Sequence, residues 1–165
     1  MESAILPDRL GGAPDGKRSV RLWLRLLTCA TTIEQRIAAR LRDEFGSTLP
    51  RFDMLSALDR AGPAGLTLGE VSRKLMVTQG NVTGLAGRLR DDGLIEPGES
   101  ADRRVQRVRL SAVGRERFAV MAAAHERWIE ALFADVTADE ADQLIELLDR
   151  AKRSLQATTP EELNP

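Results

Sequence analysis

The 165-residue chain is 42% hydrophobic and 30% charged, with a net charge of −1, which fits one globular domain with extensions and gives no overall sign of a nucleic-acid partner. Its single cysteine excludes an intramolecular disulfide, and with a single histidine it leaves too little for a metal cluster, so we expect no metal and no cofactor. The first residues do not resemble a signal peptide and no apolar run is long enough to span a membrane, which predicts a cytoplasmic protein.

Residues 1–17 are rich in glycine, proline and charge and predict a flexible N-terminal arm. A long helix is predicted from about Ser19 to Phe45, because apolar residues recur there every three or four positions, at Leu26, Ala30, Ile33, Ile37, Leu41 and Phe45. Residues 46–50 end this helix. The second helix is expected to turn three residues inward, namely Phe52, Leu55 and Leu58, before residues 61–65 break the chain.

Thr67 and Glu70 form a capping-box pattern, in which each side chain satisfies a backbone N–H at the start of a helix. The short helix that follows is expected to bury Leu68, Val71 and Leu75. Residues 76–77 then make a tight turn, and Thr78 is expected to cap the next helix. Gly93 supplies the left-handed residue that commonly ends a helix.

After Gly93 the apolar period changes to two, so residues 94–97 and 105–110 predict two strands joined by a loop at 98–102. Ser111 is expected to cap another long helix. A second capping box, formed by Thr137 and Glu140, opens a last helix whose apolar stripe is Ala141, Leu144, Ile145, Leu148, Ala151 and Leu155. The fold class is therefore mainly α with a small β-hairpin wing, and residues 48–110 are predicted to form a winged helix-turn-helix domain.

Three glycines, Gly80, Gly84 and Gly87, lie inside the helix that begins after Thr78, although each costs about 1 kcal/mol relative to alanine. With 100° between successive residues, they lie opposite the apolar residues Val82, Leu85 and Leu89. This bare, exposed stripe is bordered by the polar side chains Gln79, Asn81, Thr83, Arg88 and Arg90. It would let a DNA major groove approach the backbone closely, and Gln and Asn can pair there with adenine. Tolerated surface glycines without a role are the alternative.

Four arginines lie in or beside the predicted wing, at positions 103, 104, 107 and 109. Arginine at a wing tip can enter the minor groove, so we assign Arg103 and Arg104 to DNA, while a solvated surface charge is the reading for one or two of the four. Residues 65–110 carry eight basic and six acidic residues, a net charge of +2, whereas residues 134–165 carry three and eight, a net charge of −5. The middle of the chain is therefore expected to face phosphates. The predicted DNA-binding residues are Arg73, Lys74, Thr78, Gln79, Gly80, Asn81, Thr83, Gly84, Arg88, Asp102, Arg103 and Arg104.

The same residues resemble the multiple-antibiotic-resistance regulator (MarR) family. Residues 102–104, followed by Val108, Leu110 and Ser111, are similar to its wing signature D-x-R-x-x-x-V-x-L-[ST]. Three further segments resemble its recognition helix and exit, namely Asn81-Val-Thr83, Arg88-Leu89 and Gly93-Leu-Ile95. The start of the second predicted helix, with Leu49, Phe52 and Leu55, also resembles the start of the second helix of the family. The similarity runs from about Leu49 to Gly114, and the flanking helices match in placement only.

The resemblance implies an obligate homodimer whose dimerisation region comprises residues 18–47 and 111–158. It also implies a transcription factor, commonly a repressor, on a pseudo-palindromic operator with half-sites roughly 10 base pairs apart. Members often release DNA when a small aromatic acid or its coenzyme A thioester binds, and Trp23 is a candidate to line that site, although a packing role is favoured for it. The family often carries a larger and frequently basic residue at the position of Gly84. Because a glycine stands here instead, Gln79, Asn81 and Thr83 are the residues expected to contact bases, and Arg88 is expected to contact phosphate.

Three other functions are weighed against this one. Redox sensing would use Cys29, but such sensors usually support the thiol with tyrosines, and this chain has none. A winged helix that binds proteins rather than DNA would more often show an apolar exposed patch than a polar glycine face. An enzyme is not predicted, because no nucleophile–base pair, carboxylate pair or phosphate loop stands out.

Overall fold

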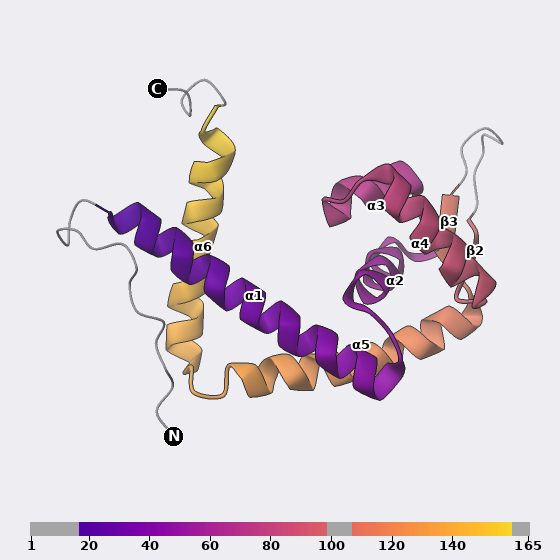
Figure 1. Ribbon diagram of the computed structural model, residues 1–165, viewed down its shortest axis with the longest axis horizontal. Coiled ribbons are helices and arrows are strands. Elements are labelled where there is room, and N and C mark those ends of the chain that lie inside the picture. The colour runs from indigo at the N-terminus through magenta and orange to yellow at the C-terminus, as the bar shows by residue number, and fades with distance from the viewer. Residues whose placement is uncertain (1–16, 99–106, 160–165) are drawn as a thin grey trace. The chain divides into compact units, whose positions relative to one another are not determined.

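The structure is a computed structural model that describes residues 17–98 and 107–159. Residues 1–16 of the predicted arm and the predicted wing tip, with Asp102, Arg103 and Arg104, lie outside the described residues. The elements, shown in Figure 1, are α1 (Arg18–Phe45), α2 (Leu49–Ala61), the 3₁₀ turn η1 (Gly62–Ala64), β1 (Leu66–Thr67), α3 (Leu68–Leu75), α4 (Gln79–Asp91), β2 (Ile95–Pro97), β3 (Arg107–Leu110), α5 (Ala112–Leu132) and α6 (Ala138–Ala157).

This order confirms the predicted mainly α fold with a winged helix-turn-helix. The chain forms two compact units, one ending at Ala124 and the other beginning at His125, within α5. In residues 17–98 and 107–159, every helix is either too short or too polar to cross a membrane.

The core of the first unit is built around α2. Its side chains Met54, Leu55 and Leu58 are at most 1% exposed. Phe52 is also buried, and its ring lies 5.5 Å from the ring of Phe118 on α5. The prediction that Phe52, Leu55 and Leu58 face inward is therefore confirmed, and burial of each such side chain stabilises the fold by about 1.5–3 kcal/mol.

The helix-turn-helix begins with the predicted capping box. The Glu70 N–H donates to Thr67 Oγ1 over 3.1 Å, and the Thr67 N–H donates to Glu70 Oε2 over 2.7 Å. Of the three residues expected to be buried in α3, Val71 is buried, while Leu68 and Leu75 are only partly so. The turn to α4 passes through Met76 in the left-handed conformation, with φ of 52°. Thr78 does occupy the N-cap position, but among the described residues its side chain accepts no capping hydrogen bond, so that part of the prediction was wrong.

The sheet has three strands in the order β1-β3-β2, all antiparallel. The hairpin of β2 and β3, which we call the wing base, was predicted, but β1 was not, because two residues show no alternation. In β1, Leu66 pairs with Val108 and Thr67 pairs with Arg107. Just before it, a β-carbon on Gly65 would lie 2.2 Å from the Val108 carbonyl oxygen, so only glycine permits this close approach.

The segment that leaves α4 packs closely against the start of α5. Ser111 Oγ donates to the Gly93 carbonyl over 2.6 Å and accepts from the Gly114 N–H over 2.9 Å, which confirms Ser111 as a helix cap. Gly93 has φ of 70° and follows the end of α4 in the left-handed conformation, as predicted. A β-carbon on Gly114 would lie 1.9 Å from the Leu94 carbonyl oxygen, so α5 packs directly against the backbone that leaves α4.

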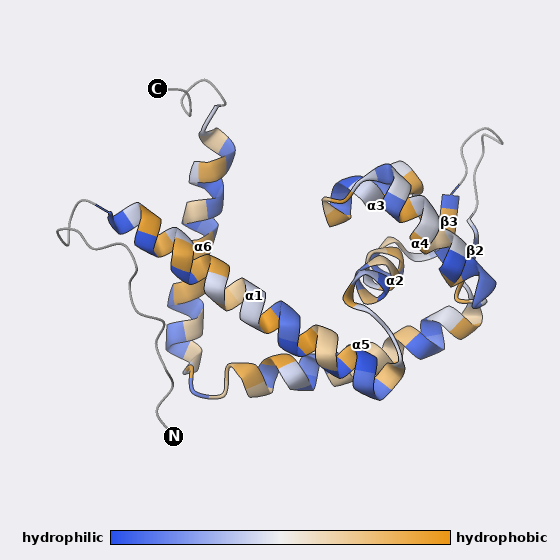
Figure 2. Cartoon of the chain, viewed as in Figure 1, coloured by the Kyte–Doolittle hydropathy of each residue, from blue (hydrophilic) through white to orange (hydrophobic). Residues whose placement is uncertain are grey.

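The apolar stripes of α1 and α6 are largely exposed in the single chain. Ile37 and Leu41 of α1 are buried, but Leu26 and Ala30, earlier in the same stripe, are exposed. Every described residue of α6 is at least partly exposed, including the hydrophobic residues Leu144, Ile145, Leu147, Leu148 and Leu155. Figure 2 shows hydrophobic positions recurring along both helices. The two amphipathic patterns were predicted correctly, and both leave apolar surface in contact with solvent.

We expect Gly114→Ala to destabilise the protein by about 2–3 kcal/mol, because the added methyl group would force the Leu94 backbone away from α5. The control is Gly87→Ala, where an added β-carbon has no described atom within 4 Å beyond its chain neighbours and its own helix backbone, and where alanine should stabilise helix α4 by about 1 kcal/mol. Urea unfolding at one fixed protein concentration measures both changes. Equal stability of Gly114→Ala and the wild type would contradict the close packing of Gly114 against the Leu94 backbone.

Candidate nucleic-acid interface

Helix α4 divides sharply into a buried face and a bare face. Val82, Leu85, Ala86 and Leu89 are buried against the rest of the unit. On the opposite side, a β-carbon added to Gly80, Gly84 or Gly87 would have no described atom within 4 Å apart from its chain neighbours and the backbone of its own helix. The glycine stripe predicted from the helical spacing is thus open, and nothing in the described part of the chain packs on it.

One flank of this stripe brings together polar side chains from two helices. Gln79 Nε2 and Arg73 Nη1 both lie within 4 Å of the place where a β-carbon on Gly69 would stand, so the end of α3 and the start of α4 share one polar cluster. The hydroxyl of Thr83 donates to the Gln79 carbonyl over 2.9 Å. Because that proton is already used, Thr83 can offer DNA its methyl group and its oxygen lone pairs.

The remaining predicted contacts on the helix-turn-helix are also accessible. Arg73 and Lys74 are exposed in the last turn of α3, and Thr78 is exposed at the start of α4. Asn81 and Arg88 are exposed on the second flank of the glycine stripe. All predicted DNA-binding residues that the structure describes are therefore placed on α3, α4 or the turn between them.

The second flank borders a cavity that sequence reasoning missed. This cavity, which we call the α2–α4 cavity, has a volume of about 750 Å³. Gly80, Asn81, Gly84 and Arg88 line it from α4, and residues from the α1–α2 connection and the first turns of α2 line it from the other side. No local pattern could have indicated it, because its two walls lie some thirty residues apart in the chain.

Arg51 and Asp53 of α2 give the α2–α4 cavity its charge, together with Arg88. Arg51 forms an ion pair with Asp92 at the end of α4, while its Nε is buried and has no hydrogen-bond partner among the described residues. Burial raises the pKa of the Asp53 carboxyl, and the nearby Glu34 carboxylate raises it further, while Arg60 lowers it. The cavity is therefore lined by the guanidinium groups of Arg51 and Arg88 and by the Asp53 carboxyl.

Two of the four arginines assigned to the wing are used inside the protein. Arg107 donates from Nε to the Ala64 carbonyl and from Nη2 to the Gly65 carbonyl, each over 3.0 Å, and lies 3.3 Å from a Glu70 carboxylate oxygen. Arg109 donates from Nε to Glu96 over 3.0 Å across the wing base. The alternative weighed from the sequence was a solvated surface charge for one or two of the four, whereas Arg107 and Arg109 are bonded within the protein. Arg103 and Arg104 lie outside the described residues, so their assignment stays a prediction.

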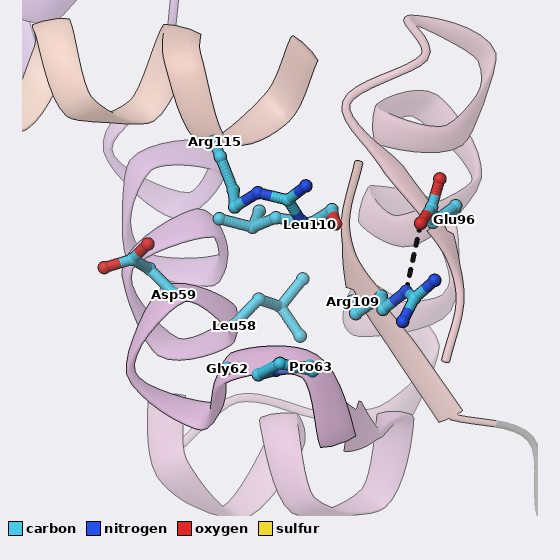
Figure 3. Close-up of a pocket in the computed structure, with 8 residues that line it drawn as sticks. All are labelled: Leu58, Asp59, Gly62, Pro63, Glu96, Arg109, Leu110 and Arg115. Carbon is cyan, nitrogen blue, oxygen red and sulfur yellow. Dashed lines mark hydrogen bonds and ion pairs between the residues drawn. The ribbon is translucent and has the colours of Figure 1, made fainter. Parts of the chain in front are cut away.

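A smaller cavity of about 300 Å³ lies between the end of α2, η1, the wing base and α5. Figure 3 shows that Arg115 reaches toward Leu110, whose carbonyl accepts from Arg115 Nη1 over 3.0 Å, while the carboxylate of Asp59 points away from the other side chains. Two arginines and two carboxylates line this cavity, and Arg109 is paired with Glu96. Its charges balance, so it offers no net attraction for an anion.

Trp23 lines neither of these two cavities, and its side chain on α1 is 59% exposed. Its assignment to an effector site therefore stays a prediction. Cys29 is an exposed free cysteine on the same helix. Within residues 17–98 and 107–159, no group of three His, Cys, Asp or Glu side chains is arranged to hold a metal ion.

Comparison with known proteins supports the winged helix-turn-helix fold. The model of the MarR family matches residues 45–104. The chain is 32% identical to the transcriptional activatory protein BadR of Rhodopseudomonas palustris over 154 residues, which covers 86% of this chain and 85% of that protein. Its fold matches a MarR family transcriptional regulator from Silicibacter pomeroyi, with a TM-score of 0.73, 28% identity and coverage of 87% and 99% of the two chains. It also matches MepR of Staphylococcus aureus in complex with DNA, with a TM-score of 0.68, 18% identity and coverage of 86% and 99%.

We expect Asp53→Asn to raise the thermal unfolding midpoint at pH 7, because the half-buried carboxylate must be ionised there. The folded pKa of Asp53 lies above its unfolded value of 3.8, so the stability linked to its protonation is fully present below that value and is lost as the pH rises through the folded pKa. The gain from Asp53→Asn should therefore shrink as the pH falls toward 3.8. Thermal unfolding from pH 3.5 to 7.5 checks this, with the exposed Asp59→Asn as the control, and an equal gain at every pH would refute it.

Proposed function

The chain belongs to the MarR family of DNA-binding transcriptional regulators, and from this premise we propose that it binds a pseudo-palindromic operator as a homodimer, with α4 of each subunit in the major groove. The observation that carries the proposal is the open glycine stripe of α4. A bare stripe allows the backbone and its flanking side chains to come close to base edges.

The chemistry beside the stripe fits base reading. Gln79 and Asn81 carry amides, which can bond adenine through two hydrogen bonds, and the methyl group of Thr83 can contact thymine. Arg73, Lys74 and Arg88 lie around them and suit phosphates, since contacts with phosphate position a protein without reading sequence. We further propose that Arg103 and Arg104 enter the adjacent minor groove. The same polar face argues against a module that binds only proteins.

The homodimer is supported by the exposed apolar stripes of α1 and α6. Leu22, Leu26 and Leu27 on α1 and Leu144, Ile145 and Leu148 on α6 are all at least 38% exposed. Large apolar faces on a folded chain mark surfaces that a partner covers. A two-fold symmetric dimer would present two copies of α4 to half-sites about 10 base pairs apart.

We also propose that a small aromatic acid acts as the effector and binds in the α2–α4 cavity. Its volume of about 750 Å³ lies in the range usual for small-molecule sites, and Arg51 and Arg88 can bond a carboxylate. Because Gly80 and Gly84 form its wall, an occupant would lie against the helix that reads DNA. A coenzyme A thioester is the alternative effector, and redox sensing through Cys29 is the alternative trigger, which loss of operator binding on peroxide treatment would reveal.

The direction of regulation is a separate question. The family resemblance predicts a repressor, whereas the relative in Rhodopseudomonas palustris is described as an activatory protein. A reporter gene placed behind the operator separates the two: expression rises on deletion of the regulator if it represses, and falls if it activates.

We expect Gly84→Leu to weaken operator binding about 100-fold, or about 1.4 kcal/mol for each of two subunits, because leucine would fill the space that the groove must enter. Gly84→Ala should have a smaller effect. The operator is first selected from random DNA with the wild-type protein, and affinities are then measured by fluorescence anisotropy, while light scattering checks that the dimer is retained. Full affinity in Gly84→Leu would exclude close approach at the glycine stripe.

We expect Arg51→Met to keep operator affinity but to weaken release by aromatic acids about tenfold or more, since a hydrogen bond to a charged group contributes about 1.5–3 kcal/mol. Benzoate, salicylate and phenylacetate are titrated into the protein–operator complex. The control is Arg40→Met, which removes an exposed arginine paired with Glu44 on α1. If Arg51→Met and Arg40→Met respond to the acids equally, the effector does not use this cavity.

A further inference from the structure

Arg107 joins parts of the chain that lie far apart in sequence. Its guanidinium bonds the carbonyls of Ala64 and Gly65, which precede β1, and pairs with Glu70 in the first turn of α3. The side chain is 27% exposed, so these contacts are only partly screened by water. One side chain of β3 therefore spans the whole segment that leads into the helix-turn-helix.

Glu70 has two roles in this arrangement. It accepts the Thr67 N–H as part of the capping box that starts α3, and it also receives the charge of Arg107. These same contacts hold the pKa of the Glu70 carboxyl below its usual value, first through hydrogen bonds with Thr67 and then through Arg107. The start of α3 and the strand β3 thus share a single carboxylate.

The backbone at Arg107 strengthens the connection. Arg107 pairs with Thr67 in the sheet, and its carbonyl accepts the Gly98 N–H over 2.8 Å at the end of β2. Arg107 on β3 is therefore in contact with β1, with the end of β2 and with the first turn of α3. Arg109, two residues later on β3, pairs instead with Glu96 of β2, so its ion pair stays within the wing base.

We propose that Arg107 is a positioning residue for DNA binding: it fixes the spacing between the wing base and the helix-turn-helix and does not itself contact DNA. This rests on the proposed function, in which the recognition helix and the wing occupy neighbouring grooves. Two protein surfaces that bind one rigid duplex lose affinity for DNA when their spacing varies, even if every residue that contacts DNA is intact. One of the four arginines in or beside the predicted wing thus acts through its protein partners.

The test compares three variants with the wild type over a range of salt concentrations. Arg107→Met removes the fork and the charge, whereas Arg107→Lys keeps the charge but cannot donate to two carbonyls and a carboxylate in one plane. Arg109→Met is the matched control, because that side chain is 28% exposed and lies on the same strand. We expect both Arg107 variants to lose about tenfold in operator affinity with an unchanged salt slope, and Arg109→Met to stay within about twofold.

Three results of the binding measurements would overturn the proposal. Wild-type affinity in Arg107→Lys, or a smaller salt slope in Arg107→Met, would place Arg107 on phosphate. An equal loss in Arg109→Met would show a general effect of the wing base on stability.

A readout on the free protein separates this proposal from the function on which it rests. Amide hydrogen exchange should become several-fold faster at Leu66–Glu70 and Arg107–Leu110 in both Arg107 variants, and should stay unchanged in α1 and in Arg109→Met. If the wild type selects no operator, the proposed function fails, and exchange alone decides whether Arg107 joins the wing base to α3. Exchange equal to that of the wild type would refute the connection.

Discussion

The burial of α2 is the constraint on which the rest of the first unit depends. Helices α1, α3 and α4, the turn η1 and the strand β3 all contact α2, and Met54, Leu55 and Leu58 are almost completely removed from solvent. Both cavities are formed at its ends, with Arg51 and Asp53 at the first turns and Leu58 and Asp59 near the last. Because α4 is held on α2 by its apolar residues, its opposite face is free for a partner.

Whether a charged side chain of this unit is available to a partner depends on its ion pairs, not on the net charge of its segment. Glu70 and Glu96, which count against the positive charge of the middle segment, are the partners of Arg107 and Arg109. Arg51 is likewise used to connect α2 to Asp92 at the end of α4. Among the described residues of the middle segment, 65–98 and 107–110, the exposed cations are Arg73, Lys74, Arg88 and Arg90, on α3 and α4 beside the glycine stripe. Net charge over a segment therefore does not report which of its arginines are paired within the protein.

The features that could be predicted from sequence are those set by local spacing. The helix order, both capping boxes, the left-handed Gly93 and the bare face of α4 follow from residues at most a few turns apart, and the structure has all of them. The strand β1, the partners of Arg107 and the α2–α4 cavity depend on chain segments roughly 30 to 42 residues apart, which periodicity does not report. Thr78 failed as a cap for a related reason, since a residue type that favours capping does not fix the rotamer that performs it.

The glycine stripe has a thermodynamic consequence beyond the room it leaves. Three glycines lower the intrinsic helix propensity of α4 by about 3 kcal/mol relative to alanine, so the segment would be largely unfolded as an isolated peptide. Its helical state is maintained by the apolar contacts of its inner face and by whatever occupies its outer face. Association on that face and the ordering of α4 are therefore one coupled equilibrium, in which a partner that binds only the ordered helix also suppresses its fraying.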